Sequence, residues 1–157
     1  MSRTLSATGL ASMLANETAE EWIILLTISH VSFSTVRLAR RSINIVSNGE
    51  TFNSRYFELT WPDQTPNNIP QWQLSLDIVD QAVLAELRAI TTPPTVRIDL
   101  IRASSPDTIE MTTGDDYKLR NMRYISTTMT AEISMEDLLD EGFPSGRILP
   151  SNFPGGF

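Results

Sequence analysis

Apolar and polar residues alternate along several short stretches of this chain, and a period of two predicts β-strands that bury one face. The clearest stretch is residues 71–78, where Trp72, Leu74, Leu76 and Ile78 fall on the same face. The pattern predicts four further strands downstream, at residues 95–102, 108–113, 117–124 and 127–134. Because turn residues separate the first three of these, we expect them to form an antiparallel meander.

The first part of the chain predicts three more strands. Residues 20–29 (EEWIILLTIS) contain an apolar run without the alternation of a half-exposed strand, so they predict a central strand. Residues 36–46 and 51–60 lie on either side of Asn48-Gly49, and Asn-Gly is the strongest short signal for a hairpin turn. We therefore expect these two strands to pair.

Two short helices are predicted beside the strands. Residues 4–16 begin with hydroxyl side chains that can cap a helix, and they place Leu10, Met13 and Leu14 on one stripe. Gly9 weakens this helix, because glycine has a low helix propensity. Residues 81–90 predict a second helix, capped by Asp80. Residues 61–70 (WPDQTPNNIP) contain three prolines and two asparagines and predict a long loop.

Together these elements predict a mainly β (α+β) fold. About seven strands with two short helices are typical of a single β-sandwich or barrel. A length of 157 residues fits one domain that buries a core without disulfides or metals. We expect a β-rich domain at residues 1–139, with an N-terminal helix, followed by an extended arm at residues 140–157.

The expected arm (DEGFPSGRILPSNFPGGF) combines helix-breaking residues with aromatic ones. It holds three of the six phenylalanines and four of the seven glycines. Proline and glycine argue against a helix or a central strand, yet each phenylalanine gains about 1.5–3 kcal/mol by burial. We therefore expect the arm to dock on its own domain or on a neighbouring subunit. The expected interface residues are Phe143, Arg147, Ile148, Leu149, Phe153 and Phe157 of the arm, with Trp61 and Ile69 of the long loop.

Composition and charge narrow the function classes. The net charge of −7 repels a phosphate backbone, so sequence-specific nucleic-acid binding is not expected. The local exception is Arg37, Arg40 and Arg41, for which we favour a solvated face, an interface salt bridge or protection of a strand edge. The absence of cysteine rules out disulfides and thiolate metal sites. The N-terminus lacks a signal-peptide core, and no apolar run is long enough to span a membrane.

Catalytic signals are weak. The single histidine, His30, has no acid or nucleophile near it in sequence, so we expect a turn or surface residue. Adjacent carboxylates occur at Glu20-Glu21, Asp115-Asp116, Glu136-Asp137 and Asp140-Glu141, in settings typical of turns and solvated helix faces. Trp22 and Trp72 follow the core-facing pattern, which leaves Trp61 as the one tryptophan that we expect to be partly exposed. We expect no enzymatic activity, no metal and no cofactor.

The order of these segments resembles a bacteriophage tail-protein family, usually described only as a domain of unknown function and found among minor tail genes of long-tailed phages. The resemblance spans the chain, through MSRTLSATGLASMLANET, WIILLTISH, FELTWPDQ, LSLDIVDQAVLAELRAITTPPTVRIDLIRASSPDTIE and FPSGRILPSNFPGGF. The chain is similar to the amino-terminal region of lambda-type minor tail protein L or to a hub-associated adaptor. Proteins of the L type also carry a carboxy-terminal iron–sulfur domain, for which this chain has no cysteine.

This resemblance implies a virion protein at the distal tail or tail tip, made in the bacterial cytoplasm. Its implied partners are other tail proteins (tube, distal tail, hub, tape measure) and further copies of itself in a closed ring, with no membrane. Two alternatives remain open. One is a small carbohydrate-binding or hydrolase-like β domain, which would gather Trp61 and two of the paired carboxylates on a concave surface. The other is an assembly factor absent from finished particles.

Overall fold

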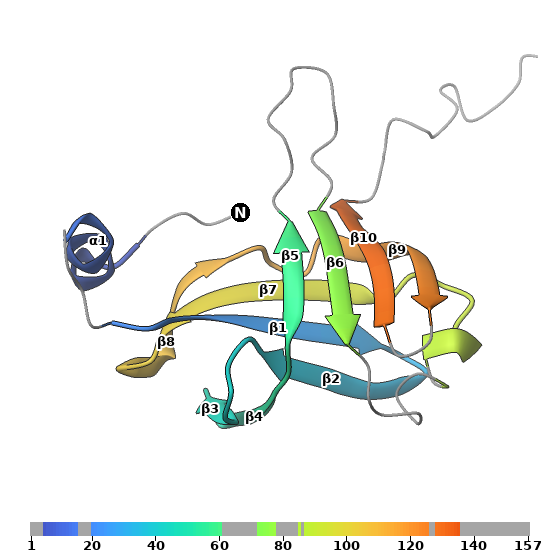
Figure 1. Ribbon diagram of the computed structural model, residues 1–157, viewed down its shortest axis with the longest axis horizontal. Coiled ribbons are helices and arrows are strands. Elements are labelled where there is room, and N and C mark those ends of the chain that lie inside the picture. The colour runs from blue at the N-terminus through green and yellow to red at the C-terminus, as the bar shows by residue number, and fades with distance from the viewer. Residues whose placement is uncertain are drawn as a thin grey trace, which may run out of the picture.

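The fold is one open mixed sheet of ten strands (Figure 1). The computed structural model describes residues 5–15, 20–60, 72–77, 85, 87–125 and 128–135. The strands are β1 (Trp22–His30), β2 (Phe33–Ala39), β3 (Ile45–Ser47), β4 (Glu50–Ser54), β5 (Phe57–Thr60), β6 (Trp72–Asp77), β7 (Thr95–Arg102), β8 (Ser105–Thr112), β9 (Tyr117–Ile125) and β10 (Thr128–Met135). Their order is β3-β4-β2-β1-β7-β9-β10-β6-β5, with β8 paired to β7 beside this path. Only β2 and β4 pair in parallel among the described strands.

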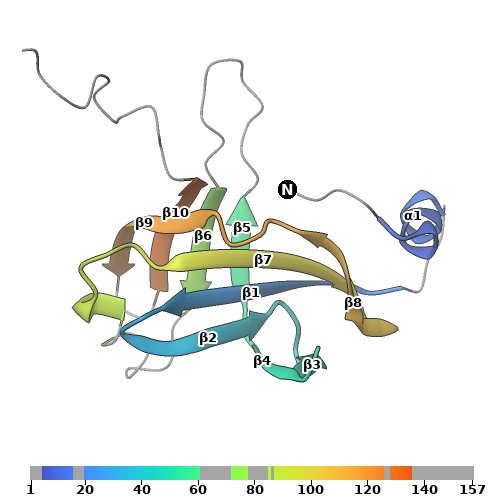
Figure 2. The same cartoon turned by 180° about the vertical axis from the view of Figure 1, so that it is seen from behind.

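The sheet bends into two layers. In Figures 1 and 2, β5, β6 and β10 cross β1, β2 and β7 steeply, with one set in front of the other. β9 carries the sheet between the layers, because it pairs with β7 only at Tyr117 and Lys118 and then pairs with β10 along its length. On the far side, Arg55 and Tyr56 are the only residues between β4 and β5. This two-residue link joins β4, the neighbour of the edge strand β3, to β5, the edge strand at the opposite end of the strand order.

The main core lies between the two layers. Alternate residues of β6 and β10 supply it, as the period of two predicted: Trp72, Leu74 and Leu76, with Met129, Ala131 and Ile133. Leu26 and Ile28 of β1 face them from the other layer. Trp72 also meets Tyr117 edge to face, with ring centroids 6.2 Å apart.

The central position of β1 explains its continuous apolar sequence. Its other face contributes Ile23 and Leu25 to a second cluster, which includes Phe52 of the β3–β4 hairpin and Ile101 of β7. β1 is therefore buried on both faces along much of its length, which confirms the expectation of a central strand. Trp22 at its start is only half-buried, so the core-facing prediction holds for Trp72 and not fully for Trp22.

The fold is mainly β as predicted, but it is one open mixed sheet of ten strands and not the predicted sandwich or barrel of about seven. β8 and β9 both pair with β7, so β7, β8 and β9 do not form the predicted meander. Residues 36–46 and 51–60 each contain a break: β2 ends at Ala39 before β3 begins, and β4 ends at Ser54 before β5 begins. The chain bends at these points to cover the second face of β1 and to cross between layers. The predicted hairpin turn is confirmed, because Asn48 and Gly49 have φ angles of 50° and 80° and join β3 to β4.

Both predicted helices have a counterpart. α1 (Ala7–Leu14) is capped by Ser6, whose hydroxyl accepts a hydrogen bond from the Gly9 amide at 3.0 Å. Residue 85 and residues 87–89 are helical, and Leu87 is buried in the main core. The hydroxyl of Tyr124 donates a hydrogen bond to the carbonyl of Leu87 at 3.2 Å, which fixes this second helix against β9.

Candidate interaction surfaces

The interface residues predicted from the sequence lie outside the described residues. This applies to Phe143, Arg147, Ile148, Leu149, Phe153 and Phe157 of the arm, and to Trp61 and Ile69 of the loop. Their assignment as interface residues stays a prediction. The described residues instead present three surfaces: the helix α1, an arginine-lined hollow and a polar hollow.

α1 is held at the end of the sheet by a polar contact with Glu110 of β8. The Ser6 amide and hydroxyl donate to the two carboxylate oxygens of Glu110, each at 2.8 Å. Arg102 Nε forms an ion pair with the same carboxylate at 2.8 Å. We call Ser6, Gly9, Arg102 and Glu110 the latch.

Gly9 is the point of closest approach in the latch. A Cβ built on residue 9 would lie 2.6 Å from Glu110 Oε2 and 2.9 Å from Cδ, so a larger residue does not fit without movement. The glycine that weakens the helix in isolation therefore lets the helix reach its anchor. The sequence carries no local signal for this role, because Glu110 belongs to a distant strand.

The carboxylate of Glu110 is shielded from solvent and still charged. Its side chain is fully buried, and that of Arg102 is 13% exposed. Burial by itself raises the pKa of Glu110, but the hydrogen bonds from Ser6 and Arg102 outweigh it and hold the pKa below its ordinary value. The latch is therefore a charged contact at neutral pH.

The predicted apolar stripe of α1 points away from the rest of the described fold. Leu10, Met13 and Leu14 are 49%, 51% and 73% exposed. Figures 1 and 2 place α1 beyond the end of the sheet, where it covers no sheet face. Exposed apolar residues that form a contiguous patch mark interaction sites. The stripe is therefore an anchored apolar surface without a partner among the described residues.

A second surface gathers three arginines around a hollow of about 540 Å³. Arg40 and Arg41 follow β2, Arg55 lies between β4 and β5, and Asp77 ends β6. Ser42, Ser54 and Tyr56 complete the lining. The sequence indicated Arg40 and Arg41 as a basic cluster but contained no sign that Arg55 joins them. The third arginine of the predicted cluster, Arg37, pairs with Glu50 at 3.0 Å.

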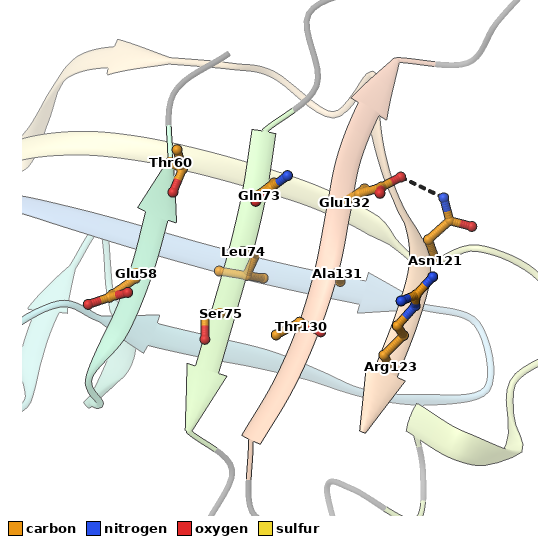
Figure 3. A pocket seen from close by; sticks show the side chains of 10 residues that line it. All are labelled: Glu58, Thr60, Gln73, Leu74, Ser75, Asn121, Arg123, Thr130, Ala131 and Glu132. Carbon is orange, nitrogen blue, oxygen red and sulfur yellow. Dashed lines mark hydrogen bonds between the residues drawn. The ribbon is translucent and has the colours of Figure 1, made fainter. Parts of the chain in front are cut away.

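The third surface is a polar hollow of about 440 Å³ on the outer face of β5, β6, β10 and β9 (Figure 3). Its lining is Glu58, Thr60, Gln73, Leu74, Ser75, Asn121, Arg123, Thr130, Ala131 and Glu132. A bulge in β9 opposite Ala131 places Asn121 at a φ of 50°, and its amide donates to Glu132 at 2.5 Å. Glu58 accepts a hydrogen bond from the Tyr56 hydroxyl at 2.8 Å.

The residues weighed as catalytic candidates lie apart. His30 ends β1 and bonds Thr92 Oγ1 at 2.6 Å, which confirms a position at a turn. Glu20 accepts hydrogen bonds from the Ser104 amide and hydroxyl, while Glu21 pairs with Arg41. Asp115-Asp116 lies between β8 and β9, as a turn composition predicted. The pairs at 136–137 and 140–141 lie outside the described residues.

Two classes of site have no candidate in the described part of the chain. Its Asp, Glu and His side chains form no cluster of three that could hold a metal ion. Over the same residues, neither helix has the length and apolar character needed to cross a bilayer. The candidate surfaces are thus an apolar helix stripe, a basic hollow and a polar hollow.

These surfaces define the chain as a β-rich domain with an anchored helix. The chain belongs to a family described as "Domain of unknown function (DUF1833)", which matches residues 9–148. This span includes most of α1, all ten strands and part of the predicted arm. No curated protein matches the chain.

Proposed function

We propose that this chain is a structural virion protein of a long-tailed bacteriophage, located at the distal tail or tail tip as a hub or adaptor. It acts by assembly: copies form a ring, and the arm at residues 140–157 docks on a neighbouring subunit. The observation that supports assembly most is the exposed stripe Leu10, Met13 and Leu14 on α1. The sequence resemblance to minor tail proteins supplies the phage setting.

The latch strengthens the case for an assembly surface. The apolar side chains of Leu10, Met13 and Leu14 are exposed, so their burial does not explain why α1 is held at the edge of the sheet. A buried, fully bonded carboxylate at Glu110 nevertheless holds it there, through Ser6 and Arg102. Because a fixed apolar surface binds with less loss of conformational entropy than a mobile one, the latch favours docking of a partner on α1.

Mass spectrometry of purified phage particles tests this function. The structural role predicts that the chain is present in a fixed ratio to the known tail proteins. An assembly factor would be abundant in infected cells and absent from finished particles. A companion experiment deletes residues 142–157: the truncated protein should no longer join its ring or tail complex, and unchanged affinity would contradict the docking arm.

The polar hollow favours a second candidate, a carbohydrate-binding domain. Glu58 and Glu132 both line the hollow of Figure 3, and the sequence places Trp61 directly after Thr60. These are not the paired carboxylates expected from the sequence. The register puts β6 between the two glutamates and offsets them by two residues, a Cα separation of roughly 12 Å.

A further inference from the structure

The lining of the arginine-lined hollow holds three arginines and one carboxylate, Asp77, so its charge is opposite to that of the protein as a whole. Three of the twelve basic side chains meet there in a chain of net charge −7. Arg41 pairs with Glu21 at 3.0 Å. Among the described residues, Arg40 and Arg55 have no carboxylate within ion-pair distance, and both are exposed. The hollow therefore offers two free guanidinium groups to an acidic ligand.

The chain itself contains a fitting ligand directly after β10. Residues 136–141 (EDLLDE) hold four carboxylates, at Glu136, Asp137, Asp140 and Glu141. The overall negative charge disfavours a nucleic acid as the ligand, since long-range repulsion opposes a phosphate backbone. A short acidic peptide carries far less charge than a duplex and is repelled less. Charge complementarity thus points to the protein's own acidic segment.

The geometry argues against contact within one copy. Asp77, which lines the hollow, pairs with Thr128 at the start of β10, whereas the acidic segment leaves β10 after Met135. The eight residues of β10 put these two ends about 23 Å apart. Glu136 and Asp137 extend at most about 7 Å beyond Met135, so they cannot reach the hollow of the same copy. Asp140 and Glu141 extend at most about 22 Å beyond it, so only a segment fully extended back along β10 would bring them near that hollow.

We infer that the arginine-lined hollow of one copy binds the acidic segment 136–141 of a second copy. The hollow includes the end of β6, and the acidic segment follows the opposite end of the same layer, after β10, so the contact joins two different parts of the surface and can be heterologous. A heterologous contact repeats from subunit to subunit and closes into a ring when the rotation allows. The inference deepens the proposed assembly function and rests on it.

Cysteine cross-linking tests the contact directly, because the natural chain contains no cysteine. Two full-length variants, Ser42→Cys in the hollow and Gly142→Cys next to the acidic segment, are mixed and oxidised. We expect a disulfide-linked heterodimer to form about tenfold faster than with the control pair Val31→Cys and Gly142→Cys. Val31 is 99% exposed at the β1–β2 turn, so its accessibility is no lower. Equal rates for the two pairs would overturn the inference.

Charge reversal adds specificity to the test. Arg40→Glu with Arg55→Glu should reduce cross-linking to the control rate, and Asp140→Lys with Glu141→Lys on the other partner should restore it. Both arginines are exposed, so circular dichroism should be unchanged. Failure of the reversed partner to restore cross-linking would contradict the contact. Binding of a DNA duplex by the natural protein that Arg40→Glu with Arg55→Glu abolishes would instead assign the hollow to phosphate.

The outcomes also separate this inference from the proposed function. If the chain is found in phage particles but the Ser42→Cys and Gly142→Cys variants do not cross-link, the proposed function stands and the inferred contact is wrong. If the variants cross-link but the chain is absent from phage particles, the inferred contact stands and the structural role in the virion is wrong.

Discussion

Gly9 packs against the carboxylate of Glu110 so closely that a methyl group at residue 9 would lie 2.6 Å from Oε2. This contact ties the first helix of the chain to β8, and it holds the apolar stripe of α1 in a fixed place. The hydrogen bonds of Ser6 and Arg102 leave the carboxylate little room to move aside. The position of α1 therefore depends on the absence of a side chain at residue 9.

Gly9→Ala should release α1 from the sheet. Helix propensity alone would make alanine about 1 kcal/mol more stable than glycine, whereas overpacking against a bonded carboxylate costs about 1–3 kcal/mol. We expect the destabilisation by the clash to exceed the gain in helix propensity. The Tm should therefore be lower, and hydrogen exchange should be faster at the Leu10 amide, which donates to the Ser6 carbonyl in the natural protein. The control is Ala11→Gly on the exposed side, which loses propensity without touching Glu110. A more stable Gly9→Ala protein would contradict the latch.

Acid should weaken the latch. The pKa of Glu110 is lowered by folding from its ordinary value of 4.5, so the charged latch stabilises the fold fully above that pH. Its contribution is then lost as the pH falls toward the lower folded pKa. The protection factor of the Ser6 amide, which donates to Glu110, should fall as the pH drops below about 4.5, and it should fall more than the protection factors of the main core.

Glu110→Gln separates this effect from general acid denaturation, because glutamine resembles the protonated carboxyl. At neutral pH it should cost about 1–3 kcal/mol, since Arg102 loses a charged partner. The difference from the natural protein should shrink below pH 4.5, where the natural carboxyl also becomes neutral as the pH falls. Glu50→Gln, at an exposed pair with Arg37, serves as a control and should change stability little. A pH-independent difference at residue 110 would argue against the charged latch.

Polar substitution of the α1 stripe should impair assembly and spare the fold. Leu10→Ser, Met13→Ser and Leu14→Ser remove exposed side chains, so the Tm of the isolated domain should change little apart from a modest loss of helix propensity. Association with tail partners, measured by sedimentation, should weaken by about tenfold or more. The matched control is Ile125→Ser, which removes a side chain 70% exposed on β9. If both variants assemble equally well, the stripe is not a docking surface.

The carbohydrate alternative makes its own prediction at the polar hollow. If the domain binds sugars there, Glu58→Gln and Glu132→Gln should each lower affinity for a bacterial surface glycan by about 1–3 kcal/mol in calorimetry. The account favoured above predicts no measurable glycan binding by the natural protein. Saturable binding that both variants weaken would support the alternative.

Local pattern predicted much of the fold. The alternation in β6 and β10 identified their buried side chains, and Asn48-Gly49 fixed the hairpin turn, because both signals depend on neighbouring residues alone. The bend at Arg55 and Tyr56 was missed, since neither glycine nor proline marks it.

The candidate surfaces were less accessible to prediction. Periodicity placed Leu10, Met13 and Leu14 on one stripe, but it could not tell whether the sheet covers that stripe. The latch and the arginine-lined hollow each join segments far apart in sequence, so only the folded chain brings them together. The roles of the predicted arm remain a prediction.

A density map of the assembled phage tail tests the central claim most directly. The account predicts several copies of this domain in a closed ring at the distal end. Residues 140–157 of each copy should lie on a neighbouring subunit, and another chain should cover the stripe of α1. A map that is complete at the tail tip without this chain would contradict the account.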